Sequence, residues 1–249
     1  MIRIVLMYHD IYTCDTTESG FQRKRDLPYK ISALSFEEHV KTIKYYCENN
    51  RVSQEHVVFT FDDGGKSFST VVAPILEKYG FKGLFFISSK FIGLENFLSE
   101  DDIIELHNHG HIIGSHAYSH KHLYKLTDAQ VDNEWRISIT ALSKIIGEKI
   151  VYASIPNGDT SKRVLEFASK NGIKHIYTSE PTTQVKMFDG MEVIGRYVLL
   201  SDSTNEYVMS IILSKKKRLI LSCKRIALKI IKSILGANYI QLKNFLFKQ

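Results

Sequence analysis

Residues 60–64 read Thr-Phe-Asp-Asp-Gly and follow a β-branched and aromatic run at 56–59, His-Val-Val-Phe. Such a run predicts a buried strand. Two adjacent carboxylates at the end of a strand repel each other, so both can face inward only if a cation or a shared proton compensates them. Gly64 and Gly65 predict a sharp turn that lets both aspartates reach the rim of the sheet. The pattern favours a divalent-metal site, although Asp-Asp-Gly is also common in ordinary turns.

A second polar motif lies downstream, where residues 114–120 read Gly-Ser-His-Ala-Tyr-Ser-His. Two histidines four residues apart can present both imidazoles to one ion when the segment is helical or tightly turned. Together with one carboxylate they form a three-ligand site that leaves a position open for water, which is a catalytic metal geometry. The alternative is a His-rich surface run, because further histidines stand nearby at 107, 109, 111 and 122.

The two motifs together resemble the polysaccharide deacetylase family, which is also called carbohydrate esterase family 4 or the NodB homology domain. The resemblance covers about residues 1–200 and implies metal-dependent removal of an acetyl group from an N-acetylated sugar. By position, it implies that Asp62 is the general base and that Asp63, His116 and His120 are the metal ligands. Zinc suits such a ligand set, while Co²⁺, Ni²⁺, Mn²⁺ and Fe²⁺ stay open.

The sequence departs from the family pattern at the partner of the base. Residues 154–158 read Ser-Ile-Pro-Asn-Gly and match a family motif that often begins with arginine, so Ser154 stands where the base would find its usual guanidinium. Another donor must then orient Asp62, and Arg196 is our candidate by its strand position. A surface salt bridge is the alternative for Arg196. From the same motif we expect Pro156 and Asn157 to contact substrate.

A second departure concerns the general acid, because no histidine lies between residues 176 and 200. Some exopolysaccharide deacetylases of this family take their acid histidine from an N-terminal strand, and Met-Tyr-His-Asp at 7–10 resembles that element. We therefore assign the acid to His9, with His175 as the fallback, although a lone histidine after a strand is more often structural. The histidines at 107, 109 and 111 are assigned to a solvated helix end.

These assignments imply a mechanism of amide hydrolysis. The metal lowers the pKa of a bound water and polarises the acetamide carbonyl, while Asp62 accepts the proton of the water. We expect a backbone amide near Tyr118 or Ser119 to help to stabilise the oxyanion. His9 then protonates the leaving amine.

Strand and helix signals alternate along the chain and predict an α/β fold, a closed or nearly closed β/α barrel. The resemblance specifies the distorted seven-stranded barrel of the family. Its expected helices begin with capping boxes at Ser35, Ser99 and Thr127, and another spans residues 161–171. Strands are expected at 2–8, 56–59, 83–88, 150–155, 175–178 and 192–199, with one more bearing the histidine motif. We assign residues 1–206 to the barrel as one domain, since a chain of this length buries one core.

The last 43 residues differ in composition, with ten Lys or Arg and no Asp or Glu between 207 and 249. This segment carries +10 and the rest −4, which gives the net charge of +6. On a helical wheel one narrow face is basic, with Arg218, Ser222, Arg225, Lys229 and Lys232, and the remainder is apolar. We expect residues 215–235 to bind an anionic membrane surface. A helix packed on the barrel with a solvated basic side is the alternative, and nucleic acid is the least favoured partner.

Composition also sets the expected compartment. Three widely separated cysteines suggest neither a disulfide framework nor a cysteine metal site. The N-terminal apolar run is too short for a signal peptide. We therefore expect a cytoplasmic protein, peripheral on the inner membrane face, that deacetylates a sugar in cell-surface polysaccharide or glycolipid biosynthesis. Two alternatives stay open: an inactive glycan-binding or scaffold protein, and an amidohydrolase acting on a non-sugar amide.

Overall fold

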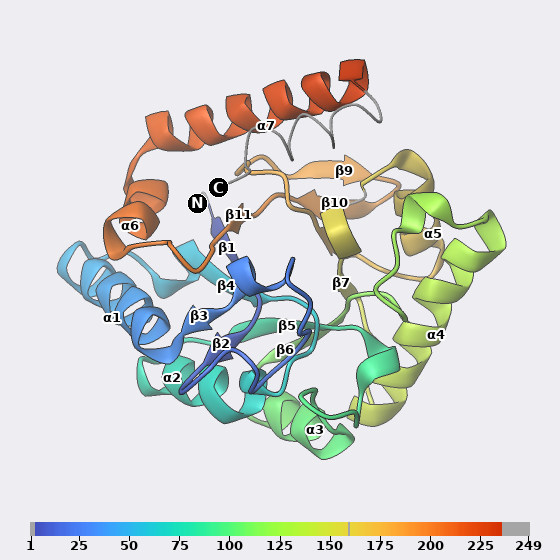
Figure 1. Cartoon of the computed structure of the whole chain (residues 1–249), viewed down its shortest axis with the longest axis horizontal. Coiled ribbons are helices and arrows are strands. Elements are labelled where there is room, and N and C mark those ends of the chain that lie inside the picture. Colours follow the sequence, from blue (N-terminus) through green and yellow to red (C-terminus); the bar gives the residue numbers. More distant parts are fainter. Residues whose placement is uncertain (1–2, 159, 236–249) are drawn as a thin grey trace.

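A computed structural model describes residues 3–158 and 160–235 of the chain. Its centre is a curled nine-stranded sheet with the order β11-β1-β4-β5-β6-β7-β8-β10-β9 (Figure 1). All neighbouring strands are parallel except β9 and β10. The strands are β1 (Ile4–Tyr8), β4 (Val57–Phe61), β5 (Gly83–Ile87), β6 (Ile112–Ser115), β7 (Tyr152–Ser154), β8 (His175–Tyr177), β9 (Lys186–Phe188), β10 (Met191–Ile194) and β11 (Tyr197–Val198). A separate small sheet pairs β2 (Ile11–Tyr12) with β3 (Ile31–Ser32).

The predicted barrel is confirmed, and one broken strand completes it. β10 pairs with β8, whereas β11 pairs with β1 at the other side of the sheet. Only Gly195 and Arg196 separate the two, so the segment 191–198 occupies the seventh strand position between β8 and β1. A side chain at 195 would collide with the carbonyl oxygen of Glu180, and glycine therefore permits this close approach. The break places Arg196 at the inner edge of the barrel.

Helices surround the sheet (Figure 1), and α1, α3, α4, α5 and α6 bury residues in its core. In α1, for example, Phe36, Val40 and Ile43 recur at helical spacing and are fully buried. β1 and β5 are buried along their whole length, which is typical of parallel strands covered on both sides. The helices are α1 (Ala33–Asn49), α2 (Ala73–Lys78), α3 (Glu100–Asn108), α4 (Asp128–Ile146), α5 (Lys162–Lys170), α6 (Asn205–Leu213) and α7 (Lys215–Leu235).

The capping boxes predicted at Ser99 and Thr127 are confirmed, but the one at Ser35 is wrong. Ser32 is the cap of α1, and its hydroxyl accepts a hydrogen bond of 3.2 Å from the backbone N–H of Ser35. The helix therefore begins at Ala33, directly after β3. Ser35 matched the sequence signature because it is followed by Glu38, yet Ser32 offers the same cap chemistry one turn earlier.

The sequence did not predict α6, and the boundary between residues 206 and 207 falls inside it. Val208, Ile211 and Ile212 are buried in the main hydrophobic core, so α6 packs as part of the barrel. The division into a barrel and a tail stays a prediction, but the basic segment begins to differ from the core only at α7.

α7 runs along the upper edge of the molecule in Figure 1, and basic residues on one side of it contact the domain. Arg218 donates to the carbonyl oxygens of Ile211 and Ile212 at 2.6 and 2.9 Å, and the Ser222 hydroxyl donates to the Pro181 carbonyl. The alternative of a packed helix with a solvated basic side is therefore wrong for these residues, because they contact the domain. Lys229 and Lys232 were assigned to the same face, but their side chains lie outside the described part.

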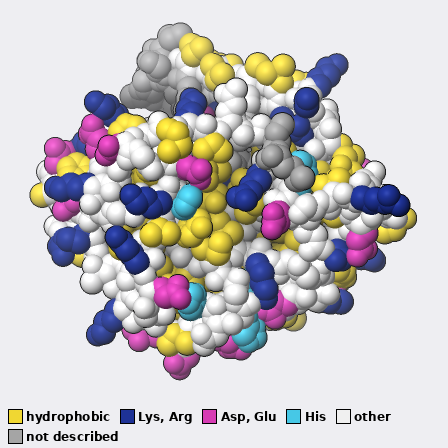
Figure 2. Space-filling model, turned by 180° about the vertical axis from the view of Figure 1, so that it is seen from behind, with side chains coloured by type: hydrophobic (Ala, Val, Ile, Leu, Met, Phe, Trp, Pro, Cys, Tyr) yellow, Lys and Arg dark blue, Asp and Glu magenta, His cyan; other side chains and the backbone are white. Residues whose placement is uncertain are grey.

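The apolar side of α7 is largely exposed, although Leu219 and Ile226 also border a hollow that Arg218 and Ser222 line. Leu219, Ile226 and Ile230 expose 64%, 57% and 53% of their surface. Figure 2 shows hydrophobic side chains gathered along the upper edge of the molecule, the edge that α7 occupies. Within residues 3–158 and 160–235, no helix is long and apolar enough to cross a membrane.

Candidate active site

Polar side chains lie at the carboxyl ends of four parallel strands of the barrel. His9 follows β1, Asp62 and Asp63 follow β4, His116 follows β6, and Ser154 ends β7. Because these strands are parallel, their carboxyl ends meet at one edge of the barrel. A cavity of about 440 Å³ opens there, and it is lined by His9, both aspartates, His116, His120 and Arg196, among others. The structure thus brings together the residues that the two motifs supply separately.

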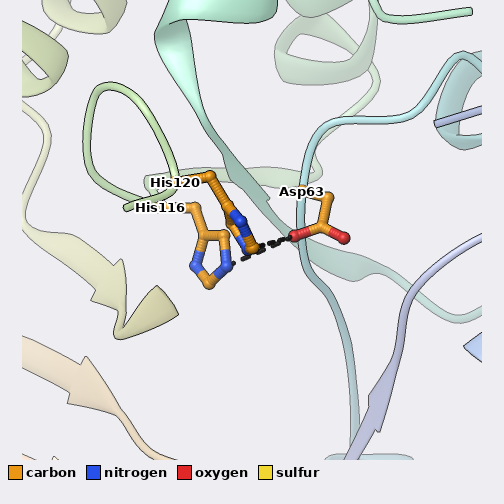
Figure 3. Close-up of side chains that lie close together, drawn as sticks. All are labelled: Asp63, His116 and His120. Atoms are coloured by element: carbon orange, nitrogen blue, oxygen red, sulfur yellow. Dashed lines mark ion pairs between the residues drawn. The ribbon is translucent and has the colours of Figure 1, made fainter. Parts of the chain in front are cut away.

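Asp63, His116 and His120 point toward one another (Figure 3). Asp63 Oδ1 lies 3.4 Å from His116 Nε2 and 3.1 Å from His120 Nε2. Two ligand atoms that are each about 2.1 Å from a tetrahedral ion lie roughly 3.4 Å apart. Asp63 Oδ1 is buried and makes no well-oriented hydrogen bond within the described chain. Spacing, donor chemistry and this unsatisfied oxygen all fit one divalent cation.

The backbone around the triad adopts conformations that aim these side chains. Asp63, Ala117 and His120 have φ values of 88°, 58° and 55°, in the left-handed region that residues other than glycine rarely adopt. Gly64 follows with φ 93°, and a side chain there would press against Ile87. Such local strain is tolerated where the surrounding structure fixes it, and it clusters at functional sites. Here it turns Asp63 out of strand alternation so that Asp62 and Asp63 both face the cavity.

Electrostatics couple the carboxylate of the triad to its two imidazoles. Burial works against ionisation of Asp63, yet the two imidazoles outweigh it and keep the pKa of Asp63 well below its usual range. Burial also lowers the pKa of His120, but the Asp63 carboxylate more than reverses this and raises it. A divalent ion placed between these groups would replace the imidazole protons as the partner of the carboxylate.

Ser154 connects the metal ligand to the base. The Ser154 hydroxyl donates to Asp62 Oδ1 at 3.0 Å. The oxygen of that hydroxyl, Ser154 Oγ, lies 2.6 Å from His116 Nδ1. The hydroxyl has one proton, so when it donates to Asp62 it must accept from His116. His116 then carries its proton on Nδ1 and presents the Nε2 lone pair toward the metal position. The serine that replaces the usual arginine therefore fixes the tautomer of a ligand.

Arg196 lies against Asp62 from the broken seventh strand. Nη1 donates to Asp62 Oδ1 and Nη2 to Oδ2, both at 2.7 Å, and the two side chains are 1% and 4% exposed. Burial would raise the pKa of Asp62, but the guanidinium and the His116 imidazole outweigh it and lower the pKa to about 2. The contact is the one that we expected in place of the missing arginine, and it is not a surface salt bridge. The catalytic part that we assign to Arg196 stays a prediction.

His9 lines the same cavity and contacts Tyr29, with ring centroids 4.5 Å apart. Burial lowers the pKa of His9, although Asp63 and Asp62 act in the opposite direction. Its Nδ1 has no hydrogen-bond partner in the described chain. Asn157 also lines the cavity, and its side chain donates to the His120 carbonyl at 3.3 Å.

The expected oxyanion donors are placed elsewhere. The amides of Tyr118 and Ser119 donate to Glu134 Oε2 at 3.1 and 2.8 Å, so both N–H groups point into the protein. The assignment of an oxyanion hole to these amides is therefore wrong. Pro156 is buried and is not among the residues that line the cavity.

Two histidine assignments also change. His175 lies at the start of β8, at the opposite end of the barrel from the site, and its Nδ1 pairs with Glu192 at 2.7 Å. It therefore cannot replace His9 as the acid. His111 is buried instead of solvated, because its imidazole accepts from the Gly83 amide at 3.0 Å and contacts Glu77 at 3.0 Å.

Sequence reasoning missed several residues of the site. Glu134 lies on the apolar face of α4 between Val131 and Ser138, and an acidic residue on a buried face was a usable signal. Tyr29 and Arg25 come from the loop that follows β2, where no motif marks them. Arg225 comes from α7, far beyond the motifs.

The comparisons with known proteins agree with this geometry. A family model described as polysaccharide deacetylase matches residues 49–176, which include the Asp-Asp-Gly motif and both metal-facing histidines. The chain is 31% identical over 134 residues to the Bacillus subtilis (strain 168) protein YxkH, whose name assigns it to the polysaccharide deacetylases. This match covers 54% of the present chain and 48% of YxkH. The peptidoglycan-N-acetylmuramic acid deacetylase PdaA of the same organism is 27% identical over 137 residues, covering 54% and 50%. The chain thus spans about half the length of these relatives.

A solved structure shows the same fold. The Streptococcus pyogenes deacetylase PplD, in complex with acetate, superposes with a TM-score of 0.71 over 85% of this chain and 98% of that one, at 20% identity. The structural similarity to PplD shows the barrel fold. The family model matches the stretch of sequence that contains the metal-facing residues. With both motifs inside the matched region and their side chains converging on one cavity, the chain belongs to the polysaccharide deacetylase family.

Proposed function

We propose that the protein is a metal-dependent N-deacetylase that removes the acetyl group from an N-acetylated sugar. The observation that carries this proposal is the meeting of two groups in one cavity, the triad of Asp63, His116 and His120 and the Asp62–Arg196 pair. The first group offers a three-ligand site with an open position, and the second offers an oriented carboxylate beside it. Zn²⁺ is the ion that we expect.

The mechanism assigns the proton transfers to residues of this chain. When bound, the ion would supply Lewis acidity for the water and the acetamide carbonyl. Asp62 accepts a proton from the attacking water, and Arg196 holds both carboxylate oxygens so that the accepting lone pair keeps one orientation. His9 donates a proton to the departing amine. Because burial lowers the pKa of His9, its imidazolium form is a stronger acid toward that amine.

A cell-surface glycan or its precursor is the substrate that we propose. PdaA is named for N-acetylmuramic acid of peptidoglycan, and a chitin deacetylase of Arthroderma benhamiae is 33% identical over 102 residues, covering 40% of this chain and 27% of that one. An inactive glycan-binding protein and a non-sugar amidohydrolase are the competing functions. The intact ligand set argues against the first, because a binding protein has no need of three converging metal ligands.

We also propose that α7 binds an anionic membrane surface. Its outward face carries Leu219, Ile220 and Ile226, and exposed lysines at 215, 216 and 224 border this apolar stripe. An apolar face with cationic edges suits the boundary between lipid headgroups and acyl chains. A position on the inner membrane face follows from this proposal together with the expected cytoplasmic location.

Acetate release tests the catalytic proposal. Purified protein should release acetate from one of three substrate groups, namely N-acetylated nucleotide sugars, lipid-linked sugars or short glycans, and should bind about one divalent ion. Asp63→Ala and His116→Ala should lose the ion and the activity, while Asp62→Asn should keep the ion and lose turnover. His107→Ala is the matched control, because His107 lies outside the cavity. Full metal content in Asp63→Ala would refute the ligand set, and acetate release from non-sugar amides alone would favour the amidohydrolase.

A further inference from the structure

The mouth of the cavity is cationic in a way that the proposed chemistry does not use. Among the residues that the structure describes, Arg23, Arg25 and Arg225 line it together with one rim carboxylate, Asp26. Deeper charges are already matched, because Asp62 pairs with Arg196 and the buried Lys30 pairs with Asp10 at 3.2 Å. The excess positive charge is therefore confined to the entrance.

Asp26 does not neutralise the rim. Both of its oxygens accept from Arg23, Oδ2 from Nε at 2.7 Å and Oδ1 from Nη2 at 3.1 Å, which is a bidentate pair. Arg25 lies 3.8 Å from the same carboxylate, beyond hydrogen-bond distance, and its side chain is 59% exposed. One carboxylate thus serves two guanidinium groups, and Arg25 keeps its donors for another partner.

Arg225 reaches the mouth from α7. A side chain built on Gly158 would come within 3.5 Å of Arg225 Nη2, and the neighbouring Asn157 donates to the carbonyl of the ligand His120. The guanidinium therefore lies over the loop that adjoins the metal triad. Its contacts are loose: Glu180 Oε1 is 3.5 Å from Nε and Ser179 Oγ is 3.5 Å from Nη2. Nε makes no hydrogen bond within the part of the chain that the structure describes.

We propose that the substrate carries an oxyanion, a phosphate or a carboxylate, on or beside the acetamido sugar, and that Arg225 and Arg25 bind it. This inference deepens the proposed function and rests on it, since the acetamide must lie at the triad while the anion lies at the mouth. Planar guanidinium groups match the paired oxygens of phosphate and carboxylate, and they do so best when their donors are not already used. Arg25 and Arg225 both lie outside the matched family segment, residues 49–176.

Paired sugars test the proposal with the full chain. N-acetylglucosamine serves as the neutral reference, N-acetylglucosamine 1-phosphate adds a phosphate, and N-acetylmuramic acid adds a carboxylate. Wild-type protein should bind at least one anionic sugar more tightly than the neutral one, and the stronger of the two identifies the anion. Arg225→Gln should weaken that binding by about 10- to 100-fold, because a charge-assisted hydrogen-bonding group is lost. Arg25→Gln should act in the same direction, and in both variants the loss should be larger for the anionic sugar than for the neutral one.

Lys224→Gln provides the matched control, because it removes one positive charge from an exposed neighbour of Arg225 on the same helix. Equal losses in Lys224→Gln and Arg225→Gln would overturn the proposal in favour of unspecific attraction. Equal binding of neutral and anionic sugars by the wild type would overturn it too. Calorimetry on metal-free protein separates this inference from the proposed function. Arginine-dependent binding without any acetate release would contradict the enzyme and support the anion site.

Discussion

The interior of the barrel and the outer face of α7 differ in whether their side chains have partners within the chain. Around Asp62, both carboxylate oxygens are occupied by Arg196, and Ser154 joins this pair to the ligand His116. On α7, Leu219 and Ile226 expose more than half of their surface and pack against no described core. The pair around Asp62 has its partners within the chain, whereas on α7 Arg218 and Ser222 are bonded to the domain and the apolar side is left open.

The difference shows which parts of the molecule need something from outside. A buried polar network is stable only when each member has a partner, so the chain itself must specify it. An exposed apolar stripe has no such requirement, but water opposes it, and such a stripe is typical of a surface that binds a lipid interface or another molecule.

The Asp62–Arg196 pair should show the largest effect on stability. Arg196→Met leaves a carboxylate buried without its cation, and such a change costs about 3–5 kcal/mol of unfolding free energy. Arg196→Lys keeps the charge but loses the bidentate contact, so it should cost less. Urea unfolding of the metal-free protein measures both. A loss below 1 kcal/mol in Arg196→Met would mean that the inner site is less self-contained than its distances indicate.

Acid should weaken the same pair. The folded pKa of Asp62 is about 2, below an unfolded value of about 3.9, so its contribution is complete above the unfolded pKa and disappears as the pH falls toward the folded pKa. A shift of this size corresponds to about 2.5 kcal/mol. The difference in unfolding free energy between wild type and Asp62→Asn should therefore shrink by about 2 kcal/mol from pH 5 to pH 2, because half of the ionisation remains at the folded pKa. A difference that is constant across this range would contradict the assigned pKa.

Glu134 should affect the metal more than the fold. Its carboxylate accepts the Tyr118 and Ser119 amides and the Ser119 hydroxyl at 2.5 Å, which holds the loop between the two ligand histidines. Glu134→Gln replaces one accepting oxygen by a donor, so the loop should loosen and metal affinity should fall by about 10- to 100-fold. Competition with a chelator measures the change. Glu166→Gln is the control, because Glu166 is exposed and pairs with the exposed Lys162 at 3.4 Å. Equal metal affinity in the two variants would show that Glu134 does not support the site.

Much of the fold followed from local signals. The capping boxes at Ser99 and Thr127 marked helix starts correctly because the cap and its third residue act on each other within one turn. The β9–β10 hairpin was missed, although its turn, Asp189-Gly190, has positive φ at both residues and is a common hairpin signal. α6 was missed because it was grouped by charge with the basic tail, while its burial depends on contacts with a distant core.

The site was predictable where residue type limits the chemistry. Adjacent aspartates and paired histidines pointed to a metal, and their convergence required only that parallel strands end at the same edge. The direction of a backbone amide could not be predicted in this way. The Tyr118 and Ser119 amides point toward the Glu134 carboxylate, and the residue types at 118 and 119 do not indicate that contact. The side of α7 that faces the barrel could not be found from its helical wheel either. The wheel separates two faces, but only tertiary contacts such as those of Arg218 choose between them.

The outer face of α7 should show the smallest effect on the fold and a large one on lipid binding. Leu219→Gln together with Ile226→Gln changes exposed positions to good helix formers, so unfolding free energy should change by less than about 0.5 kcal/mol.

If the stripe enters a lipid interface, each lost apolar side chain removes roughly 1.5–3 kcal/mol of transfer free energy. Sedimentation with vesicles containing anionic lipid should then show binding by wild type but not by the double variant. Leu34→Gln on α1, which removes a leucine that is 79% exposed, should bind as wild type does. Undiminished vesicle binding by the double variant would refute the membrane proposal. A stability loss above 1 kcal/mol would show instead that the stripe is packed within the chain itself, and the contrast with the barrel interior would disappear.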